Sequence, residues 1–367
     1  MATVGDTSAP STNTIYYDAL LTTTLDNYRA TMIDNIYKDS AFLAAMREFG
    51  GIVETSGGER IREQLMYGTN STVGSYEGYE QIDTTPQDGM TAAFYEWREL
   101  AGTIAISRRE QRQNSSEAAI MSLLEAKTRQ AEMGLREEAN NQLVRGTVSG
   151  ATFVPGNNSK DMNPLAWFMR KANATNPTAG GNVGNISASA ESWWRHNTAV
   201  LDSASADTGN AFALAVTTYA GLKVALRRMK NYCSRGSGGA PNLIITDQVT
   251  YETYENALDV NIRFQNTKMA DLGFDSIKLG GAEIIWDEVV PDVDNGTASL
   301  TDGSAFFVNT NFFRLYIDTE TNFVTTPFVT PENQTAMVAK VLLMANTCCS
   351  NLRKIGVCYA IAQTIVA

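Results

Sequence analysis

Hydrophobic residues show no period over residues 1–17 and a helical period over residues 18–49. The first segment is small and polar, which predicts an extended arm that cannot bury itself against its own chain and needs a partner surface. In the second segment, apolar residues recur at steps of three and four with a break around Ser40, so one or two helices are predicted. Gly50 and Gly51 are expected to close the last of them.

Patterns typical of extended strands replace the helical period between residues 52 and 107. Three segments suit strands because they are rich in β-branched and aromatic residues: 52–56, 59–67 and 92–107. Residues 68–91, between the last two, show no core-forming period. Hairpin connections normally have two to five residues, so a loop of about twenty is either disordered or functional. A loop of this length usually contacts another molecule.

A long helix is predicted from residue 114 to about residue 144. The segment Asn114-Ser-Ser-Glu117 supplies a capping signal, the apolar positions after it form one stripe, and Gly146 ends the helix. At roughly 1.5 Å per residue the helix is about 45 Å long. This length is suited to a spine that bridges two parts of a molecule.

An α/β core is predicted in the second half of the chain. Residues 147–192 are mainly small and polar, with one short helix expected at 164–170, and they indicate a domain boundary. Helices are predicted at 211–232 and 247–258, with Asp247 near the start of the second. Strands are predicted at 242–246, 283–286, 305–308, 312–317, 328–329, 338–344 and 356–362.

Composition narrows the class of protein. The chain has 367 residues, 43% of them hydrophobic and 19% charged, which excludes wholesale disorder and a small stapled scaffold. No run of eighteen or more apolar residues occurs, and the N-terminus has no basic or apolar signal region, so a soluble protein that folds in a cytoplasm is expected. The net charge of -11 argues against nucleic-acid binding driven by overall charge.

No pattern of reactive residues predicts a catalytic centre. His196 is the single histidine, and no nucleophile motif accompanies it, so we expect it to be structural. The glycine-rich segment 236–241 precedes a strand, whereas a phosphate-binding loop follows one, and we interpret it as a linker. The segment 292–296 lacks the acidic spacing of a calcium loop and is predicted to be a turn. The basic pairs 108–109, 227–228 and 353–354 are interpreted as solvated faces or inter-chain salt bridges.

The cysteines are also expected to be structural. They form no CxxC pair, and adjacent cysteines such as Cys348 and Cys349 do not readily form a disulfide without strain. All four are predicted to be reduced, buried thiols: Cys233, Cys348, Cys349 and Cys358. No cofactor and no metal is expected.

Three segments resemble a known family. Residues 331–346, PENQTAMVAKVLLMAN, run into TCCSNLRKIG at 347–356 and resemble the closing segment of a family of tailed-bacteriophage major capsid proteins. Residues 181–197, with their Trp-Trp-Arg pattern, resemble the entry into the second half of the same family. The segment 242–254 is similar to the first strand and helix of that half.

This resemblance covers most of residues 30–360 and implies an α+β fold, the Hong Kong 97-type phage capsid fold. The fold has an N-terminal arm, an extended loop, a peripheral domain with a long spine helix, and an axial domain. The expected assignment is the arm and its helix at 1–50, the extended loop and flanking strands at 51–107, the peripheral domain at 108–190 with the spine helix at 114–145, the axial domain at 191–335, and C-terminal strands that return to the core at 336–367.

The resemblance further implies the function of a major capsid protein. Such a subunit self-assembles into pentamers and hexamers of an icosahedral or prolate head around the double-stranded DNA of a tailed bacteriophage, in the cytoplasm of a bacterial host, and resides in the virion. We expect inter-subunit contacts at Tyr67, Gly68, Gly74, Tyr76, Gly78, Tyr79 and Gly89 of the loop and at Ile15, Tyr16 and Tyr17 of the arm. Contact with packaged DNA should be weak and nonspecific, and no membrane contact is expected.

The chain departs from the family pattern in two respects, which change the crosslinks and partners that are expected. No lysine lies between Lys38 and Lys127, so the crosslink that some members form from a lysine of the loop is not expected. Because the arm begins almost at once, a separate scaffolding protein is expected, besides a portal protein and in some shells a decoration protein.

The alternatives to a phage capsid function are an encapsulin-like nanocompartment shell and, from another class, an α/β enzyme that uses Cys349 or a carboxylate pair.

Overall fold

The computed structural model describes eight stretches of the chain, which divide between two compact units. The described residues are 40–109, 117–149, 152–171, 182–202, 210–258, 277–297, 301–332 and 335–365, with the side chains of 117–125 not described. Unit 1 comprises Met1–Ile36, Ala101–Leu135 and Phe323–Leu342, and unit 2 comprises Tyr37–Leu100, Arg136–Asn322 and Leu343–Ala367. The predicted arm residues Ile15, Tyr16 and Tyr17, and any helix before Ser40, lie outside the described residues.

A seven-stranded mixed sheet forms the centre of unit 2. Its spatial order is β10-β9-β18-β14-β11-β13-β12. The strands are β9 (Asn197–Val200), β10 (Phe212–Ala213), β11 (Leu243–Thr246), β12 (Ile277–Leu279), β13 (Ala282–Trp286), β14 (Asp302–Val308) and β18 (Gly356–Ala362). Strand β11 is parallel to β13 and antiparallel to β14, which is antiparallel to β18, so strands distant in the sequence are neighbours.

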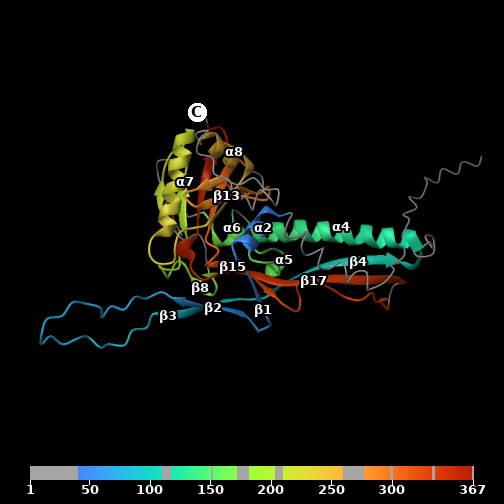
Figure 1. Cartoon of the computed structure of the whole chain (residues 1–367), viewed down its shortest axis with the longest axis horizontal. Helices are drawn as coiled ribbons and strands as arrows, with labels where there is room; N and C mark the ends of the chain where they lie inside the picture. Colours follow the sequence, from blue (N-terminus) through green and yellow to red (C-terminus); the bar gives the residue numbers. More distant parts are fainter. Residues whose placement is uncertain are drawn as a thin grey trace, which may run out of the picture. The chain divides into compact units, whose positions relative to one another are not determined.

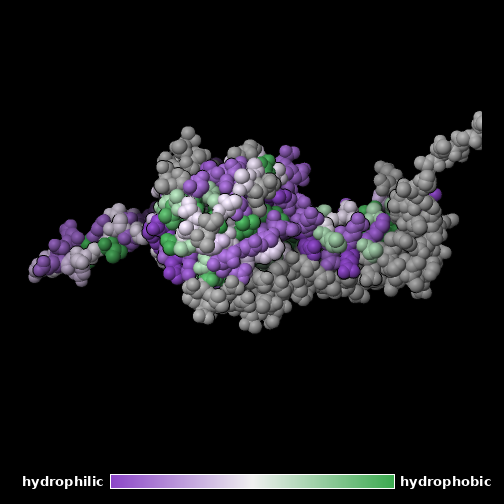
Figure 2. Space-filling model, turned by 90° about the horizontal axis from the view of Figure 1, so that it is seen from above, coloured by the Kyte–Doolittle hydropathy of each residue, from purple (hydrophilic) through white to green (hydrophobic). Residues whose placement is uncertain are grey.

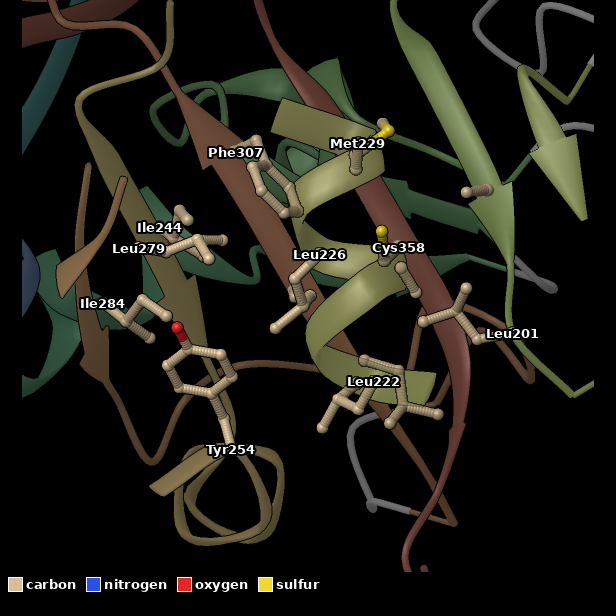
Figure 3. Close-up of a cluster of buried hydrophobic side chains, with 14 of the residues drawn as sticks. Leu201, Leu222, Leu226, Met229, Ile244, Tyr254, Leu279, Ile284, Phe307 and Cys358 are labelled. Carbon is tan, nitrogen blue, oxygen red and sulfur yellow. The ribbon is translucent and has the colours of Figure 1, made fainter. Parts of the chain in front are cut away.

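Two helices, α7 (Tyr219–Ser234) and α8 (Gln248–Asn256), pack on this sheet and close its core. Leu222, Leu226 and Met229 lie on one face of α7 because their spacing matches the helical period, and all are buried. They meet side chains from the strands and from α8 (Figure 3). The labelled partners are Leu201, Ile244, Tyr254, Leu279, Ile284, Phe307 and Cys358.

The start of α7 differs from the sequence prediction of a helix over 211–232. Phe212 and Ala213 instead form β10, which pairs with β9 through Phe212 and Ala199. The helix begins after Thr218, whose side chain accepts a hydrogen bond from the Gly221 amide at 3.2 Å. The first part of the segment therefore follows a long-range strand pairing, and its local cap fixes where the helix begins. Helix α8 agrees with its prediction, with Asp247 accepting from the Thr250 amide at 3.0 Å.

A second sheet has the order β1-β15-β17-β16, with β4 paired to β17. Its strands are β1 (Ile52–Thr55), β4 (Arg98–Ser107), β15 (Phe313–Asp318), β16 (Val324–Thr325) and β17 (Ala336–Cys349). Strand β1 runs parallel to β15, and β15 runs antiparallel to β17. Strand β17 is longer than the predicted 338–344, and the predicted strand 328–329 is reduced to a single bridge between Val329 and Val338.

The segment predicted as one strand over 92–107 is two strands. These are β3 (Met90–Tyr95) and β4, interrupted at Glu96 and Trp97. The Glu96 carbonyl accepts from the Asn346 side chain at 2.6 Å, and the Trp97 indole donates to the Gly58 carbonyl at 3.0 Å. Because β3 pairs with β2 (Ile61–Met66) and β4 pairs with β17, the interruption lets the chain change partners.

Helices α4 and α2 agree closely with local sequence signals. Helix α4 (Glu117–Val144) ends where Gly146 adopts a φ of +69° and donates to the Asn141 carbonyl at 2.8 Å, as expected of a glycine that closes a helix. Helix α2 (Ala41–Glu48) begins at Ser40, whose hydroxyl accepts from the Leu43 amide. Smaller elements fill the rest: β5 (Thr147–Ser149), β6 (Thr152–Val154), α5 (Gly156–Ser159), α6 (Leu165–Phe168), β7 (Asn182–Val183), β8 (Ile186–Ser187) and the turn η1 (Leu352–Lys354).

Candidate functional site: the extended loop and the cavity at its base

The extended loop grows out of the antiparallel hairpin β2–β3 in unit 2. The register runs from Ile61 opposite Tyr95 to Met66 opposite Met90. Alternate residues point to one face, where Ile61 and Tyr95 are buried, and the Tyr95 hydroxyl donates to the Cys349 carbonyl at 2.8 Å. Glu63 accepts a hydrogen bond from the Tyr316 hydroxyl. The hairpin is therefore anchored at its base, while residues 67–89 beyond it form no helix or strand and extend away from it (Figure 1).

The neck of the loop, residues 67, 68 and 89, is held by backbone hydrogen bonds and by aromatic stacking. The amides of Tyr67 and Gly68 both donate to the Gly89 carbonyl, at 2.9 and 3.3 Å. A Cβ added to Gly68 would lie 3.0 Å from the Cα of Gly89, so the two glycines permit a close approach of the two chain segments. The Tyr67 ring stacks on Trp193 with centroids 4.7 Å apart and an interplanar angle of 17°.

Local hydrogen bonds shape the two arms of the loop, which are the two chain segments between the neck and the tip. The Ser71 hydroxyl donates across the loop to the Gln87 side chain at 2.9 Å. Asp83 accepts from both the amide and the hydroxyl of Thr85, and these hydrogen bonds lower the pKa of Asp83. The tip is a tight turn in which the Glu80 amide donates to the Glu77 carbonyl at 3.1 Å.

The outer part of the loop exposes both hydrophobic side chains and negative charge. The exposed fractions are 82% for Val73, 67% for Tyr76, 106% for Tyr79 and 62% for Ile82. Residues 67–89 contain Glu77, Glu80, Asp83 and Asp88 and neither lysine nor arginine. Figure 2 shows this segment as mainly hydrophilic with separate hydrophobic patches. The rest of the described chain does not bury this surface, and hydrophobic side chains exposed together on one segment are typical of surfaces that bind a partner.

A cavity of about 410 Å³ lies beside the neck of the loop. Tyr67 and Trp193 supply aromatic surface, and Arg235 and Arg353 supply positive charge. The full lining is Leu65, Met66, Tyr67, Gly68, Thr69, Trp193, Trp194, Arg235, Gly236, Ser237, Ser350, Asn351, Arg353 and Lys354. The lining contains no aspartate and no glutamate.

Lys354, which belongs to the lining of this cavity, is a buried residue. The residue is 2% exposed, and its Nζ donates to main-chain carbonyls at the end of α7. The distances are 3.0 Å to Arg235, 3.3 Å to Gly236, 3.4 Å to Gly239 and 3.5 Å to Ser234. The glycine-rich segment interpreted as a linker therefore also provides main-chain carbonyls that accept hydrogen bonds from the Lys354 ammonium group.

His196, the cysteines and Asp292 are held by burial or by hydrogen bonds to the main chain. His196 Nε2 donates to the Arg170 carbonyl at 2.8 Å, and burial lowers the pKa of His196 to about 4. All four cysteines are free and buried, as predicted, and burial raises the pKa of Cys233 and of Cys349 to about 12. Asp292 accepts from the amides of Asn295, Thr301 and Asp302, which confirms a turn in segment 292–296.

Within the described residues, no group of three or more His, Cys, Asp or Glu side chains is placed to hold a metal ion. No helix in the described part of the chain has both the length and the apolar character needed to cross a bilayer.

The structure places the predicted loop residues in three groups. Tyr67, Gly68 and Gly89 meet at the neck, Gly74 and Tyr76 lie on an arm, and Gly78 and Tyr79 form the tip turn. Gly78 has a φ of +47°, whereas an added Cβ on Gly74 would meet no atom within 4 Å. Sequence reasoning missed the association of Trp193, Arg235 and Arg353 with the neck. The basic pair 353–354 and the Trp-Trp-Arg pattern were visible in the sequence, but nothing in their spacing joins them.

Comparison with known proteins identifies the fold. No family model matches the chain, and no curated protein matches it. Among solved structures, it is similar to the cyanophage A-1(L) capsid asymmetric unit, with 15% identity and a TM-score of 0.56 over 87% of this chain and 92% of that one. It is also similar to the capsid of a native GTA particle, with 16% identity and a TM-score of 0.51 over 87% and 90%. The capsid of Myoviridae phage XM1 gives 10% identity and a TM-score of 0.51 over 86% and 92%.

These similarities establish the class of fold. The chain has the α+β fold of the phage capsid proteins, which is the Hong Kong 97-type fold expected from the sequence.

Proposed function

We propose that this protein is a major capsid protein, the structural subunit of the head of a tailed bacteriophage. In this proposal, copies of the chain self-assemble into pentamers and hexamers that enclose double-stranded DNA, and the protein resides in the virion. The phage capsid fold supports the shell-forming class. Fold alone does not define function, so the argument rests on the loop.

The observation that carries the proposal is the exposed loop at residues 67–89. It presents Val73, Tyr76, Tyr79 and Ile82 to solvent on a segment that, within the described residues, is held to the rest of the chain at the neck. An isolated subunit gains nothing from this arrangement, whereas a neighbouring subunit that covers the loop would bury these side chains. We therefore assign the inter-subunit contacts to Tyr67, Gly68, Gly74, Tyr76, Gly78, Tyr79 and Gly89, and extend the proposal to Ile15, Tyr16 and Tyr17 of the arm.

The net charge of -11 fits a shell around DNA. A negative subunit repels the packaged duplex, so contact with DNA in the proposed head is weak and nonspecific and does not hinder its release. Scaffolding, portal and decoration proteins are the further partners that we propose for such a shell.

Sedimentation velocity of the purified protein, combined with negative-stain imaging, tests the proposal. The experiment is run with and without any scaffolding partner encoded beside it. Closed particles of megadalton mass, or discrete rings of five and six subunits, are the expected result. Packaged DNA would distinguish a phage head from an encapsulin-like compartment, which would hold a cargo protein. A compact monomer or dimer that never assembles would contradict the proposal and favour the enzyme alternative.

A further inference from the structure

The cavity beside the neck of the loop combines aromatic surface with unneutralised positive charge. The stacked rings of Tyr67 and Trp193 form part of its lining. Arg235 and Arg353 are exposed, and neither makes an ion pair with any residue that the structure describes. The Arg235 guanidinium lies over the Tyr232 ring, 3.7 Å from its centroid, which fixes its position without neutralising its charge. These features suit an acidic ligand that also carries an aromatic or apolar group.

The tip of the loop has the complementary chemistry. Glu77 and Glu80 lie at the two ends of the tip turn, and Tyr79 between them is fully exposed. Both glutamates are also exposed, and no positive side chain occurs anywhere in residues 67–89. An aromatic side chain flanked by two carboxylates complements the aromatic and positively charged lining of the cavity, and the cavity volume of about 410 Å³ is large enough for such a group.

The tip and the cavity of one chain are separated by the length of the loop. Gly78 is ten residue steps along the chain from Gly68 at the neck, a span of roughly 33 Å for an extended chain. The Ser71–Gln87 hydrogen bond and the neck keep the two arms together, and the loop extends away from the β2–β3 hairpin (Figure 1). Complementary surfaces at different positions on one subunit can form a heterologous contact, which closes into a ring when the rotation between copies closes.

We propose that the cavity formed by Tyr67, Trp193, Arg235 and Arg353 binds the loop tip Glu77–Glu80 of a second copy of this chain. In this contact, Tyr79 packs against the aromatic wall, and Glu77 and Glu80 pair with the two arginines. The inference rests on the proposed function and specifies one contact within it. It predicts that the strength of assembly depends on the relative sign of charge at two distant sites of the sequence.

A charge-swap experiment tests the contact in the full-length chain. Each of two single-site variants carries two substitutions at one of the two contact sites. They are Arg235→Glu/Arg353→Glu in the cavity and Glu77→Lys/Glu80→Lys at the loop tip. The third variant combines all four substitutions. Each single-site variant should raise the critical assembly concentration at least about tenfold, because it places like charges together. The combined variant should restore assembly to within about threefold of the wild type, since the charges are complementary again. Sedimentation velocity and light scattering provide the measurement.

Matched controls separate this contact from general effects of charge. Lys223→Glu/Arg227→Glu makes the same change in charge on α7, outside the cavity lining, and should not be rescued by Glu77→Lys/Glu80→Lys. The four side chains exchanged between the cavity and the tip are exposed, so the midpoint of urea unfolding should stay close to the wild-type value for the two single-site variants and the combined variant.

Each other outcome has a definite meaning. Wild-type protein that assembles, with single-site variants that assemble equally well or a combined variant that is not rescued, would overturn the inference alone. Loss of binding to a labelled DNA oligonucleotide by Arg235→Glu/Arg353→Glu, with assembly unchanged, would assign the cavity to nucleic acid and also overturn it. Wild-type protein that never assembles would contradict the proposed function and the inference together.

Discussion

At the scale of single residues, His196 makes stability depend on pH. The Arg170 carbonyl accepts its Nε2–H, and burial lowers the pKa of the folded state to about 4, against 6.5 for an unperturbed histidine. The unfolded chain therefore binds a proton that the folded chain excludes. The stabilising contribution is complete above pH 6.5 and is lost as the pH falls through the window down to about 4.

The variant His196→Gln should remove this part of the pH dependence while keeping a side-chain N–H donor. We expect the free energy of unfolding of the wild type to fall more between pH 7.5 and pH 5 than that of the variant. Urea titrations of both proteins at both pH values measure this difference. Buried carboxyls such as Asp287 are present in the wild type and in the variant, so their contributions cancel in the comparison. Because the chain has one histidine, its NMR titration is unambiguous, and a midpoint near 6.5 in the folded protein would contradict the prediction.

At the scale of elements, Lys354 determines how α7 ends. Its ammonium group donates to four carbonyls at the last residue of the helix and in the segment after it, where the end of a helix leaves carbonyls without intrahelical partners and the negative end of the helix dipole favours a cation. Lys354→Met removes the charge and leaves these carbonyls without the Lys354 donor. We expect a loss of about 1–3 kcal/mol in the free energy of unfolding, because charge-assisted hydrogen bonds are lost where the acceptor residues are exposed or half-buried.

Arg353→Met is the matched control for this substitution. Arg353 is adjacent in sequence but exposed, so its replacement should change stability by less than about 0.5 kcal/mol. Denaturant titration of both variants gives the comparison, and hydrogen exchange over residues 235–240 locates the effect. Equal stability of the two variants would show that the carbonyl contacts contribute nothing to the end of α7.

The neck of the loop gives a second prediction at this scale. A Cβ added to Gly68 lies 3.0 Å from the Gly89 Cα, whereas one added to Gly74 meets no atom within 4 Å. Gly68→Ala should therefore push the two segments apart and weaken the hydrogen bonds to the Gly89 carbonyl. Hydrogen exchange at the amides of residues 67 and 68 should become at least about tenfold faster in Gly68→Ala and stay unchanged in Gly74→Ala. Equal exchange in both variants would contradict this account of the neck.

The same elements mark what the sequence could predict. Local signals were sufficient for the ends of α4 and α8, because a glycine and a capping aspartate act on their own neighbours. The start of α7 and the division of segment 92–107 depend on pairings with β9, β2 and β17. Such pairings join residues that are far apart in the sequence, so propensity does not reveal them.

The candidate site also has one part that local sequence signals predict and another part that depends on the fold. The loop was predicted from its length and glycines, which are local properties. The cavity was not predicted, since Tyr67, Trp193, Arg235 and Arg353 come from four separate segments that only the fold brings together.

At the scale of the whole molecule, the loop and the folded core should be separable. Residues 68–88 contribute no side chain to the hydrophobic core, and the hairpin register from Met66 and Met90 inward does not depend on them. Replacing them with Asn-Gly supplies a two-residue turn that fits an antiparallel hairpin. Because shortening a loop has a small entropic effect, the free energy of unfolding should change by less than about 1 kcal/mol.

Assembly, in contrast, should be lost in this variant. The loop is the segment that reaches beyond its own chain, and without Tyr79, Glu77 and Glu80 the proposed contact between copies cannot form. Sedimentation velocity should therefore detect a folded species of low mass under conditions in which the wild type forms shells, with urea titration as the control for folding. Shells formed by the variant would contradict a role of the loop in closure. Unfolding of the variant would instead show that the loop belongs to the core, because removal of a segment that is only exposed should leave the core folded.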